Sequence, residues 1–160
     1  AVYGKRREAD DVLALGKAIT EKLRSHGIIV GESRTKDISV PLSKRARLSN
    51  ERADDYLISI HRNAYLPEMA SGVETFIHPK ASDKAVSLAR SIQESLVEVG
   101  FVDRGVKTAN FQVLRETKAP AVLVEVGFID SSDDNRLFDA KREKIVDAIT
   151  NAILGQLGKT

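Results

Sequence analysis

The sequence predicts an α/β fold: a single domain with a mostly parallel, twisted sheet that is flanked by helices on both faces. Two observations lead to this prediction. Apolar segments of strand length alternate with amphipathic segments of helix length along the chain. Residues 121–126 are almost entirely apolar, which is typical of a strand at the centre of such a sheet. The 160 residues suffice for one core, and no linker or repeat interrupts them, so we expect one domain over residues 1–160.

The N-terminal third is predicted to hold two helices and one strand. Apolar residues recur at helical spacing over residues 10–25, and Gly27 is suited to end that helix. Residues 28–30 form a short apolar run and are predicted to be a strand, and Pro41 can open a second helix. α/β domains usually begin with a core strand, whereas this chain begins with a loop and a helix. We therefore expect the first strand of the sheet to lie before Ala1, so that the domain is incomplete at its N-terminus.

The remaining two thirds continue the alternation of strands and helices. The helix over residues 83–99 is the clearest, because its apolar residues form one stripe, Ser82 is suited to cap it and Gly100 to end it. A last helix is predicted over residues 140–157. The predicted strands are residues 56–60, 73–77, 111–114 and 121–126.

The composition excludes several classes of site. The chain has no cysteine, so a disulfide framework, a zinc ribbon and a cysteine nucleophile are all excluded. A metal site must use Asp, Glu or one of the three histidines, His26, His61 and His78. Basic residues are spread along the chain, the net charge is only +2 and there is no Trp, so we expect no nucleic-acid partner. No apolar run is long enough to span a membrane, so we expect no membrane insertion.

His61 is the first candidate for chemistry, because it directly follows the predicted strand at residues 56–60 and precedes a polar loop. Ligands and metals collect outside the carboxyl ends of the strands in an open α/β sheet. A histidine at that position is a good metal-ligand candidate. The alternative is a histidine that caps the strand or lies on the surface.

Two glutamates extend the candidate site. Glu125 lies in the apolar strand at residues 121–126, where burial would raise its pKa and suit it to general acid–base catalysis. The alternatives for Glu125 are a structural pair with an arginine such as Arg115, or a place at the solvent edge of the strand. Glu8 precedes the first helix and could ligate a metal with His61, or could simply interact with the helix dipole. Two protein ligands are fewer than the three that a catalytic zinc normally has.

Three blocks of sequence carry a resemblance to a known family. The first is Ile58-Ser59-Ile60-His61-Arg62-Asn63-Ala64 with the following residues 72–76, the second joins residues 103–107 to 111–115, and the third is residues 119–129. In this order, they resemble the zinc-dependent N-acetylmuramoyl-L-alanine amidases of the Amidase_3 type, which include bacterial autolysins and phage endolysins. The resemblance covers nearly the whole chain.

The resemblance implies a site with one zinc ion. Glu8 and His61 match two of the family's three zinc ligands, and Glu125 matches its catalytic glutamate. The family's first ligand is a histidine in a turn after the first strand. It has no counterpart here, so we expect it upstream of Ala1. We also expect Asn63, Arg104 and Arg115 to contact the substrate.

The function implied by the resemblance is peptidoglycan hydrolysis. Zinc-activated water would cleave the amide between N-acetylmuramic acid and the L-alanine of the stem peptide. We expect a monomer that acts in the cell wall, either secreted or released during phage lysis. The loop at residues 63–71 is too short for the regulatory helix of some family members, so we expect an open cleft.

Two other readings remain open. A catalytically inactive relative that binds peptidoglycan through an incomplete metal site would also explain the missing histidine. A flavodoxin-like or nucleotide-binding protein would need a glycine-rich turn after the first strand, and no such motif is visible.

Overall fold

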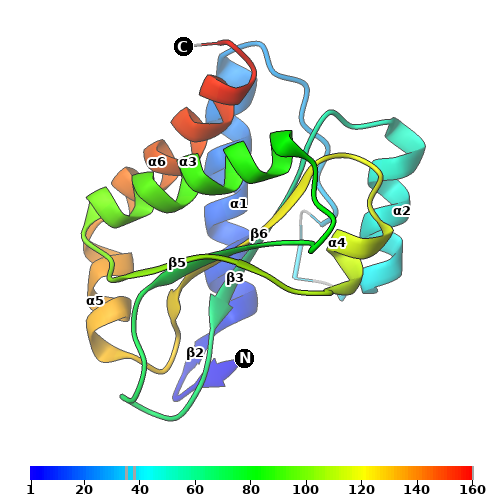
Figure 1. Cartoon of the computed structure of the whole chain (residues 1–160). Coiled ribbons are helices and arrows are strands. Elements are labelled where there is room, and N and C mark those ends of the chain that lie inside the picture. Colours follow the sequence, from blue (N-terminus) through cyan, green and yellow to red (C-terminus); the bar gives the residue numbers. More distant parts are fainter. Residues whose placement is uncertain (35, 38, 160) are drawn as a thin grey trace.

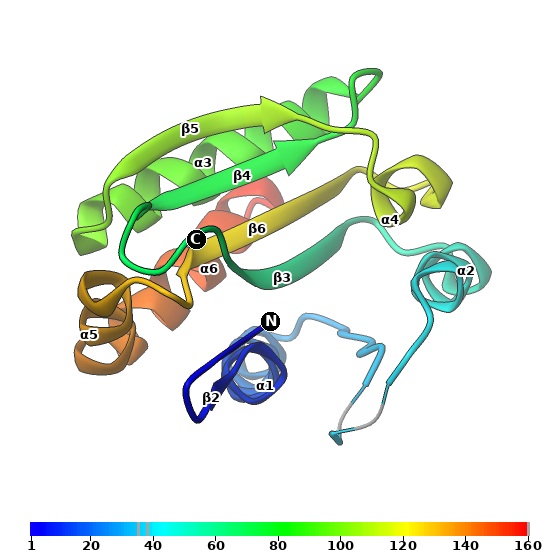
Figure 2. The same ribbon diagram turned by 90° about the horizontal axis from the view of Figure 1, so that it is seen from below.

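The computed structural model describes residues 1–34, 36–37 and 39–159, and its centre is a four-stranded sheet. The strands lie in the order β3 (Leu57–Asn63), β6 (Ala121–Phe128), β4 (Val73–Ile77) and β5 (Asp103–Thr108), which Figure 2 shows in succession. The pairs β3–β6 and β4–β5 are parallel, while β4 and β6 are antiparallel. The predicted α/β fold is confirmed, with a sheet that is mixed at one pairing. A separate hairpin joins β1 (Val2–Tyr3) to β2 (Arg6–Arg7).

Three long helices cover one face of the sheet. They are α1 (Glu8–Ser25), α3 (Asp83–Val99) and α6 (Arg142–Gln156), and Figure 1 shows α3 and α6 above the strands. The short helix α4 (Gln112–Glu116) packs on the other face and contacts α2 (Leu42–Arg52), and α5 (Ser132–Ala140) leads into α6. Among the described residues, no helix is long and apolar enough to cross a membrane.

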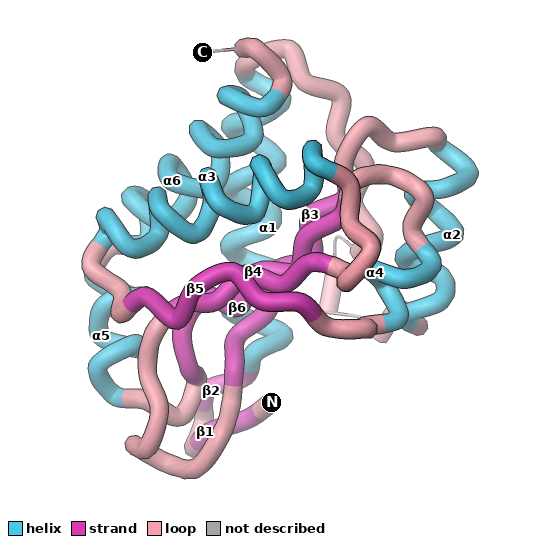
Figure 3. The backbone as a smooth tube through the Cα atoms, in the orientation of Figure 1, coloured by secondary structure: helices cyan, strands magenta, loops and turns pink. Residues whose placement is uncertain are grey.

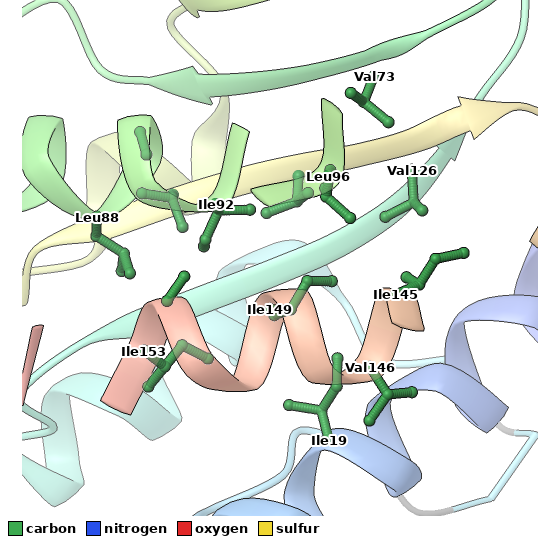
Figure 4. Close-up of a cluster of buried hydrophobic side chains, with 14 of the residues drawn as sticks. Ile19, Val73, Leu88, Ile92, Leu96, Val126, Ile145, Val146, Ile149 and Ile153 are labelled. Atoms are coloured by element: carbon green, nitrogen blue, oxygen red, sulfur yellow. The ribbon is translucent and has the colours of Figure 1, made fainter. Parts of the chain in front are cut away.

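Alternate side chains of β6 point to opposite faces of the sheet and pack into two different apolar clusters. Val122, Val124 and Val126 are fully buried against α3 and α6, as the close-up of the core shows for Val126 (Figure 4). Ala121 and Leu123 point the other way, into a smaller cluster under α4. Because successive side chains of a strand point to opposite faces, Glu125 lies on the same face as Leu123. The apolar core thus fixes the direction in which this carboxylate points.

Helix α3 shows why the sequence signals were clear in this region. The Ser82 hydroxyl accepts a hydrogen bond from the backbone N–H of Ala85, which caps the first turn. The helix ends at Gly100, whose φ of 129° an L side chain rarely adopts. Between them, an apolar stripe that includes Leu88, Ile92 and Leu96 is completely buried (Figure 4).

Two predicted strands are wrong. Residues 28–30 form no strand: Ile28 and Val30 pack against the core, but Ile29 between them is 99% exposed and no neighbouring strand pairs with them. Residues 111–114 begin the helix α4 instead. The apolar side chains Val113 and Leu114 that suggested a strand are neighbours on one helical turn that packs on β6.

The hairpin of β1 and β2 was not predicted, since a loop was expected there, and two further elements were missed. β5 is an edge strand whose residues are mostly polar and are exposed or half-buried, so it lacks the apolar signal of a buried strand. Helix α5 precedes the last helix, and the chain breaks between them at Lys141, so the predicted helix over residues 140–157 is really α6 alone. β3 also extends three residues further than predicted, which places His61 inside the strand.

The loop between β3 and β4 contains turns but no helix or strand. Figure 3 shows it extending from the same end of the molecule as the hairpin and the N-terminus. Glu68, with a φ of 62°, holds the loop against the start of α5, because its carboxylate accepts hydrogen bonds from the backbone N–H and the hydroxyl of Ser132. Exposed apolar side chains of the loop, Tyr65, Leu66 and Met69, face solvent.

Candidate active site

The candidate site lies on the face of the sheet that α4 partly covers. His61, Glu125 and Glu74 are register partners on the three neighbouring strands β3, β6 and β4. Side chains of register partners point to the same face, so an imidazole and two carboxylates form one row across the sheet. The row begins beside Glu8, the first residue of α1.

Glu8 and His61 form the first part of the site. Glu8 Oε2 lies 3.4 Å from His61 Nδ1 and accepts a hydrogen bond of 2.9 Å from the backbone N–H of Arg62. Burial alone would raise the pKa of Glu8, but the hydrogen bonds from His61 and from the Arg62 backbone outweigh it and lower the pKa to about 2. The carboxylate is therefore ionised beside the imidazole, as a pair of zinc ligands requires. The other ring nitrogen of His61, Nε2, lies 2.9 Å from the Ser59 hydroxyl.

Glu125 forms the second part. Its Oε2 is buried and, within the described parts of the chain, has no hydrogen-bond partner. Burial raises the pKa of Glu125 to about 7; the charges of Glu8 and Glu74 act in the same direction and His61 opposes them. A carboxylate with that pKa can both take and return a proton near neutral pH. The alternative of a structural pair with Arg115 is wrong, because Arg115 instead donates to the backbone and side-chain oxygens of Asn110.

Glu74 forms the third part and collects three donors. It accepts hydrogen bonds from Asn63 Nδ2 at 2.7 Å, from Arg104 Nε at 3.1 Å and from Lys107 Nζ at 2.5 Å. Burial would raise the pKa of Glu74, but Lys107 and Arg104 together outweigh it, and the pKa is lowered. The structure thus brings the predicted residues Asn63 and Arg104 into the site, beside Glu125.

Other candidates lie elsewhere. Arg115 and His78 both contact Asn110, and His78 Nε2 lies 3.2 Å from Asn110 Oδ1. Arg115 therefore lies outside the row of His61, Glu125 and Glu74, and the structure gives no support for the predicted contact of Arg115 with substrate. His26 bonds the carbonyl of Lys22 at the end of α1. Of the three histidines, His61 alone adjoins the two candidate glutamates.

Sequence reasoning missed Glu74 and Lys107. Glu74 interrupts the apolar strand Val73–Ile77 just as Glu125 interrupts its own strand, so the argument used for Glu125 would have found it. Lys107 had no such signal, because it lies on the edge strand β5 whose pairing was not predicted.

The buried side chain of Arg62 connects the strand that carries His61 to two helices. Arg62, the residue after His61, has a fully buried side chain that donates to Asp11 Oδ2 at 2.7 Å and to Asn135 Oδ1 at 2.7 Å. Its guanidinium lies 4.3 Å from the centre of the Phe138 ring. The contacts join β3 to α1 and α5, and so fix the strand that carries His61 to the helix that carries Glu8.

Glu8 and His61 are suitable as two ligands of a zinc ion. An ionised carboxylate and an imidazole are both suitable ligands, and they lie side by side. The described residues contain no group of three or more His, Cys, Asp or Glu side chains arranged to hold a metal ion.

Comparison with known proteins gives a consistent result. The family model of the N-acetylmuramoyl-L-alanine amidases, Amidase_3, matches residues 1–155. The N-acetylmuramoyl-L-alanine amidase CwlM of Bacillus licheniformis is 36% identical over 120 residues, which are 74% of this chain and 46% of that protein. The endolysin of Bacillus phage SPP1 is 34% identical over 138 residues, 82% of this chain and 50% of that protein. The chain thus spans about half the length of these two relatives.

Solved structures agree in fold. The crystal structure of N-acetylmuramoyl-L-alanine amidase from Clostridium difficile 630 superposes with a TM-score of 0.92 at 34% identity, covering 98% of this chain and 87% of that one. The catalytic domain of CwlV from Bacillus (Paenibacillus) polymyxa var. colistinus superposes with a TM-score of 0.89 at 25% identity, covering 98% and 88%. With its sequence and its fold in agreement, the chain belongs to the Amidase_3 family of N-acetylmuramoyl-L-alanine amidases.

Proposed function

We propose that this chain is the catalytic part of a peptidoglycan amidase that cleaves the bond between N-acetylmuramic acid and the L-alanine of the stem peptide. The observation that carries the proposal is the buried Glu125 carboxylate beside the Glu8–His61 pair, with a pKa of about 7. Membership of the amidase family supports the choice of substrate. The names of the relatives, which include an endolysin and a cell wall amidase, support action in the cell wall.

We also propose one zinc ion, held by Glu8, His61 and a third histidine from outside these 160 residues. A groove of about 930 Å³ runs between α1 and β3, and its mixed polar and apolar lining includes Ile58 and Ile60. β3 pairs only with β6 among the described strands, so the groove follows an unpaired strand edge where a further strand would fit. When bound, zinc would make water nucleophilic near neutral pH and stabilise negative charge on the carbonyl oxygen.

The residues of the chain then have distinct roles. Glu125 accepts a proton from the attacking water and returns it to the nitrogen of the leaving L-alanine, so the carboxylate is regenerated after each turnover. One C–N bond breaks and one C–O bond forms. Glu8 keeps its charge, and Arg62 holds its carboxylate in place through the backbone N–H.

The test is the variant Glu125→Gln, which keeps the shape of the side chain but removes its basicity. We expect turnover of purified peptidoglycan to fall on the order of 10²–10⁴-fold, with the zinc content unchanged. Retention of more than a few per cent of turnover would rule out the general-base role.

An inactive peptidoglycan-binding relative is the second candidate. It is favoured by one observation: the described residues supply only two arranged metal ligands. Zinc content separates the candidates. One zinc per molecule together with turnover supports the amidase, whereas binding of peptidoglycan with neither zinc nor turnover supports the binding protein.

A further inference from the structure

Two cations converge on one buried carboxylate at the far end of the active-site row. Lys107 Nζ and Arg104 Nε both donate to Oε2 of Glu74, at 2.5 and 3.1 Å. The Glu74 side chain is only 7% exposed, whereas those of Arg104 and Lys107 are 34% and 43% exposed. Two positive charges facing one negative charge leave a net positive charge, and it is the cations that solvent can reach.

Both cations keep donors free. Arg104 engages Glu74 through Nε, and neither of its Nη atoms bonds an acceptor among the described residues. The guanidinium lies 4.9 Å from the centre of the Phe128 ring, which restrains its plane. Because Glu74 and Phe128 already orient the side chain, little entropy would be lost when it binds an anion.

Arg104 and Lys107 lie close to the proposed general base, Glu125. Glu74 and Glu125 are register partners on adjacent strands, and Lys107 lies one strand further, on β5. With neighbouring strands ~4.8 Å apart, the backbone of β5 lies roughly 10 Å from that of β6. The two cations reach back from β5 to Glu74, one strand away from Glu125 and on the side away from His61.

The chemistry of the proposed substrate indicates which anion reaches them. The lactyl carboxyl group of the muramic acid is consumed in the amide that is cut, so the free carboxylates near this bond belong to the stem peptide. We infer that Lys107 and Arg104, oriented by Glu74, bind a carboxylate of the stem peptide and thereby place the peptide across β4 and β5. This inference rests on the proposed function and names the part of the substrate that the site selects.

The experiment compares two soluble muramoyl peptides of the same sequence. In one, the carboxylates beyond L-alanine are free; in the other, each is a primary amide. For the unaltered zinc-loaded protein, we expect kcat/KM to favour the free acid on the order of tenfold, mainly through KM, because a charged hydrogen bond is lost with the amide. In Lys107→Met the preference should fall to within about twofold. Lys107→Arg should restore it, because the positive charge is kept.

The control is Lys144→Met, since Lys144 is an exposed lysine on α6, away from this face, and it should keep the full preference. Equal cleavage of both substrates by the unaltered protein, or an unchanged preference in Lys107→Met, would overturn the inference and leave the amidase function standing. An equal loss on both substrates in Lys107→Met would also overturn it, because that result indicates a purely structural role. Cleavage of neither substrate by the unaltered protein would instead count against the proposed function.

Discussion

Glu125 and Glu74 are register partners in adjacent strands, yet their surroundings move their pKa values in opposite directions. The Oε2 atom of Glu125 is buried and has no partner among the described residues, and burial raises the pKa of this carboxyl to about 7. Glu74 is buried as well, but Lys107 and Arg104 donate to it and lower its pKa. One row of the sheet thus presents a proton acceptor beside a carboxylate whose pKa is lowered. Burial without a hydrogen-bond partner at Oε2 sets the first value, and the donors Lys107 and Arg104 set the direction of the second.

This contrast leads to a prediction about stability in acid. A carboxylate whose pKa is lowered by folding stabilises the protein above its unfolded pKa, near 4.5, and this contribution disappears as the pH falls through the lower folded value. We expect Glu74→Gln to lower the free energy of unfolding at pH 7 and to reduce its loss on acidification. Urea unfolding of both proteins between pH 7 and pH 3 measures the effect. Parallel curves for the two proteins would contradict it.

Zinc binding is a second prediction for single residues. His61→Ala removes an imidazole from the proposed metal site, so the zinc content should fall from about one per molecule to near zero. The matched control is His78→Ala, because His78 contacts Asn110 and lies outside the row. Elemental analysis after dialysis measures both. Full zinc retention in His61→Ala would remove this residue from the site.

At the scale of elements, Arg62 connects β3 to α1 and α5 through buried contacts. Removing it leaves Asp11 facing only Arg6 and leaves Asn135 without this donor. We expect Arg62→Met to destabilise the fold by about 3–5 kcal/mol, the range for breaking a buried ion pair. The exposed pair Arg136–Asp133 is the comparison, and Arg136→Met should cost less than about 1 kcal/mol. Similar costs for the two variants, measured by urea unfolding, would refute the proposed importance of burial.

The entry into β4 gives a second prediction at this scale. Gly72 has a φ of 114°, and a Cβ there would lie 2.5 Å from the backbone oxygen of Val102. Gly72→Ala should therefore destabilise the protein by at least about 2 kcal/mol. Gly155, near the end of α6, has open space around it, and Gly155→Ala should stabilise by about 0.5–1 kcal/mol. Thermal unfolding tests the pair, and a stable Gly72→Ala protein would show that the loop can shift.

For the whole molecule, the sequence predicted those features that depend on burial and periodicity. The core helices and β6 carry strong apolar patterns, and Glu125 was noticeable because it interrupts one of them. β5 was missed because an edge strand needs few apolar residues, and α4 was mistaken for a strand because a short apolar run fits either structure.

The candidate site was predictable only in part, for a related reason. His61 and Glu125 could be found from their own strands, but their adjacency depends on the pairing of β3 with β6, which are about sixty residues apart in the sequence. The same holds for Lys107, which reaches Glu74 only because β5 pairs with β4. Pairing between distant strands is a property of the whole fold, so no local pattern contains it.

The central claim is that Glu125, beside the Glu8–His61 pair, supports hydrolysis of the muramoyl–L-alanine amide. The most direct test is mass spectrometry of peptidoglycan fragments released by the zinc-loaded protein. We expect stem peptides that begin with a free L-alanine amine, together with glycan strands that keep intact lactyl carboxylates, and neither product with Glu125→Gln. Fragments cut within the glycan or within the peptide, or no fragments at all, would contradict it.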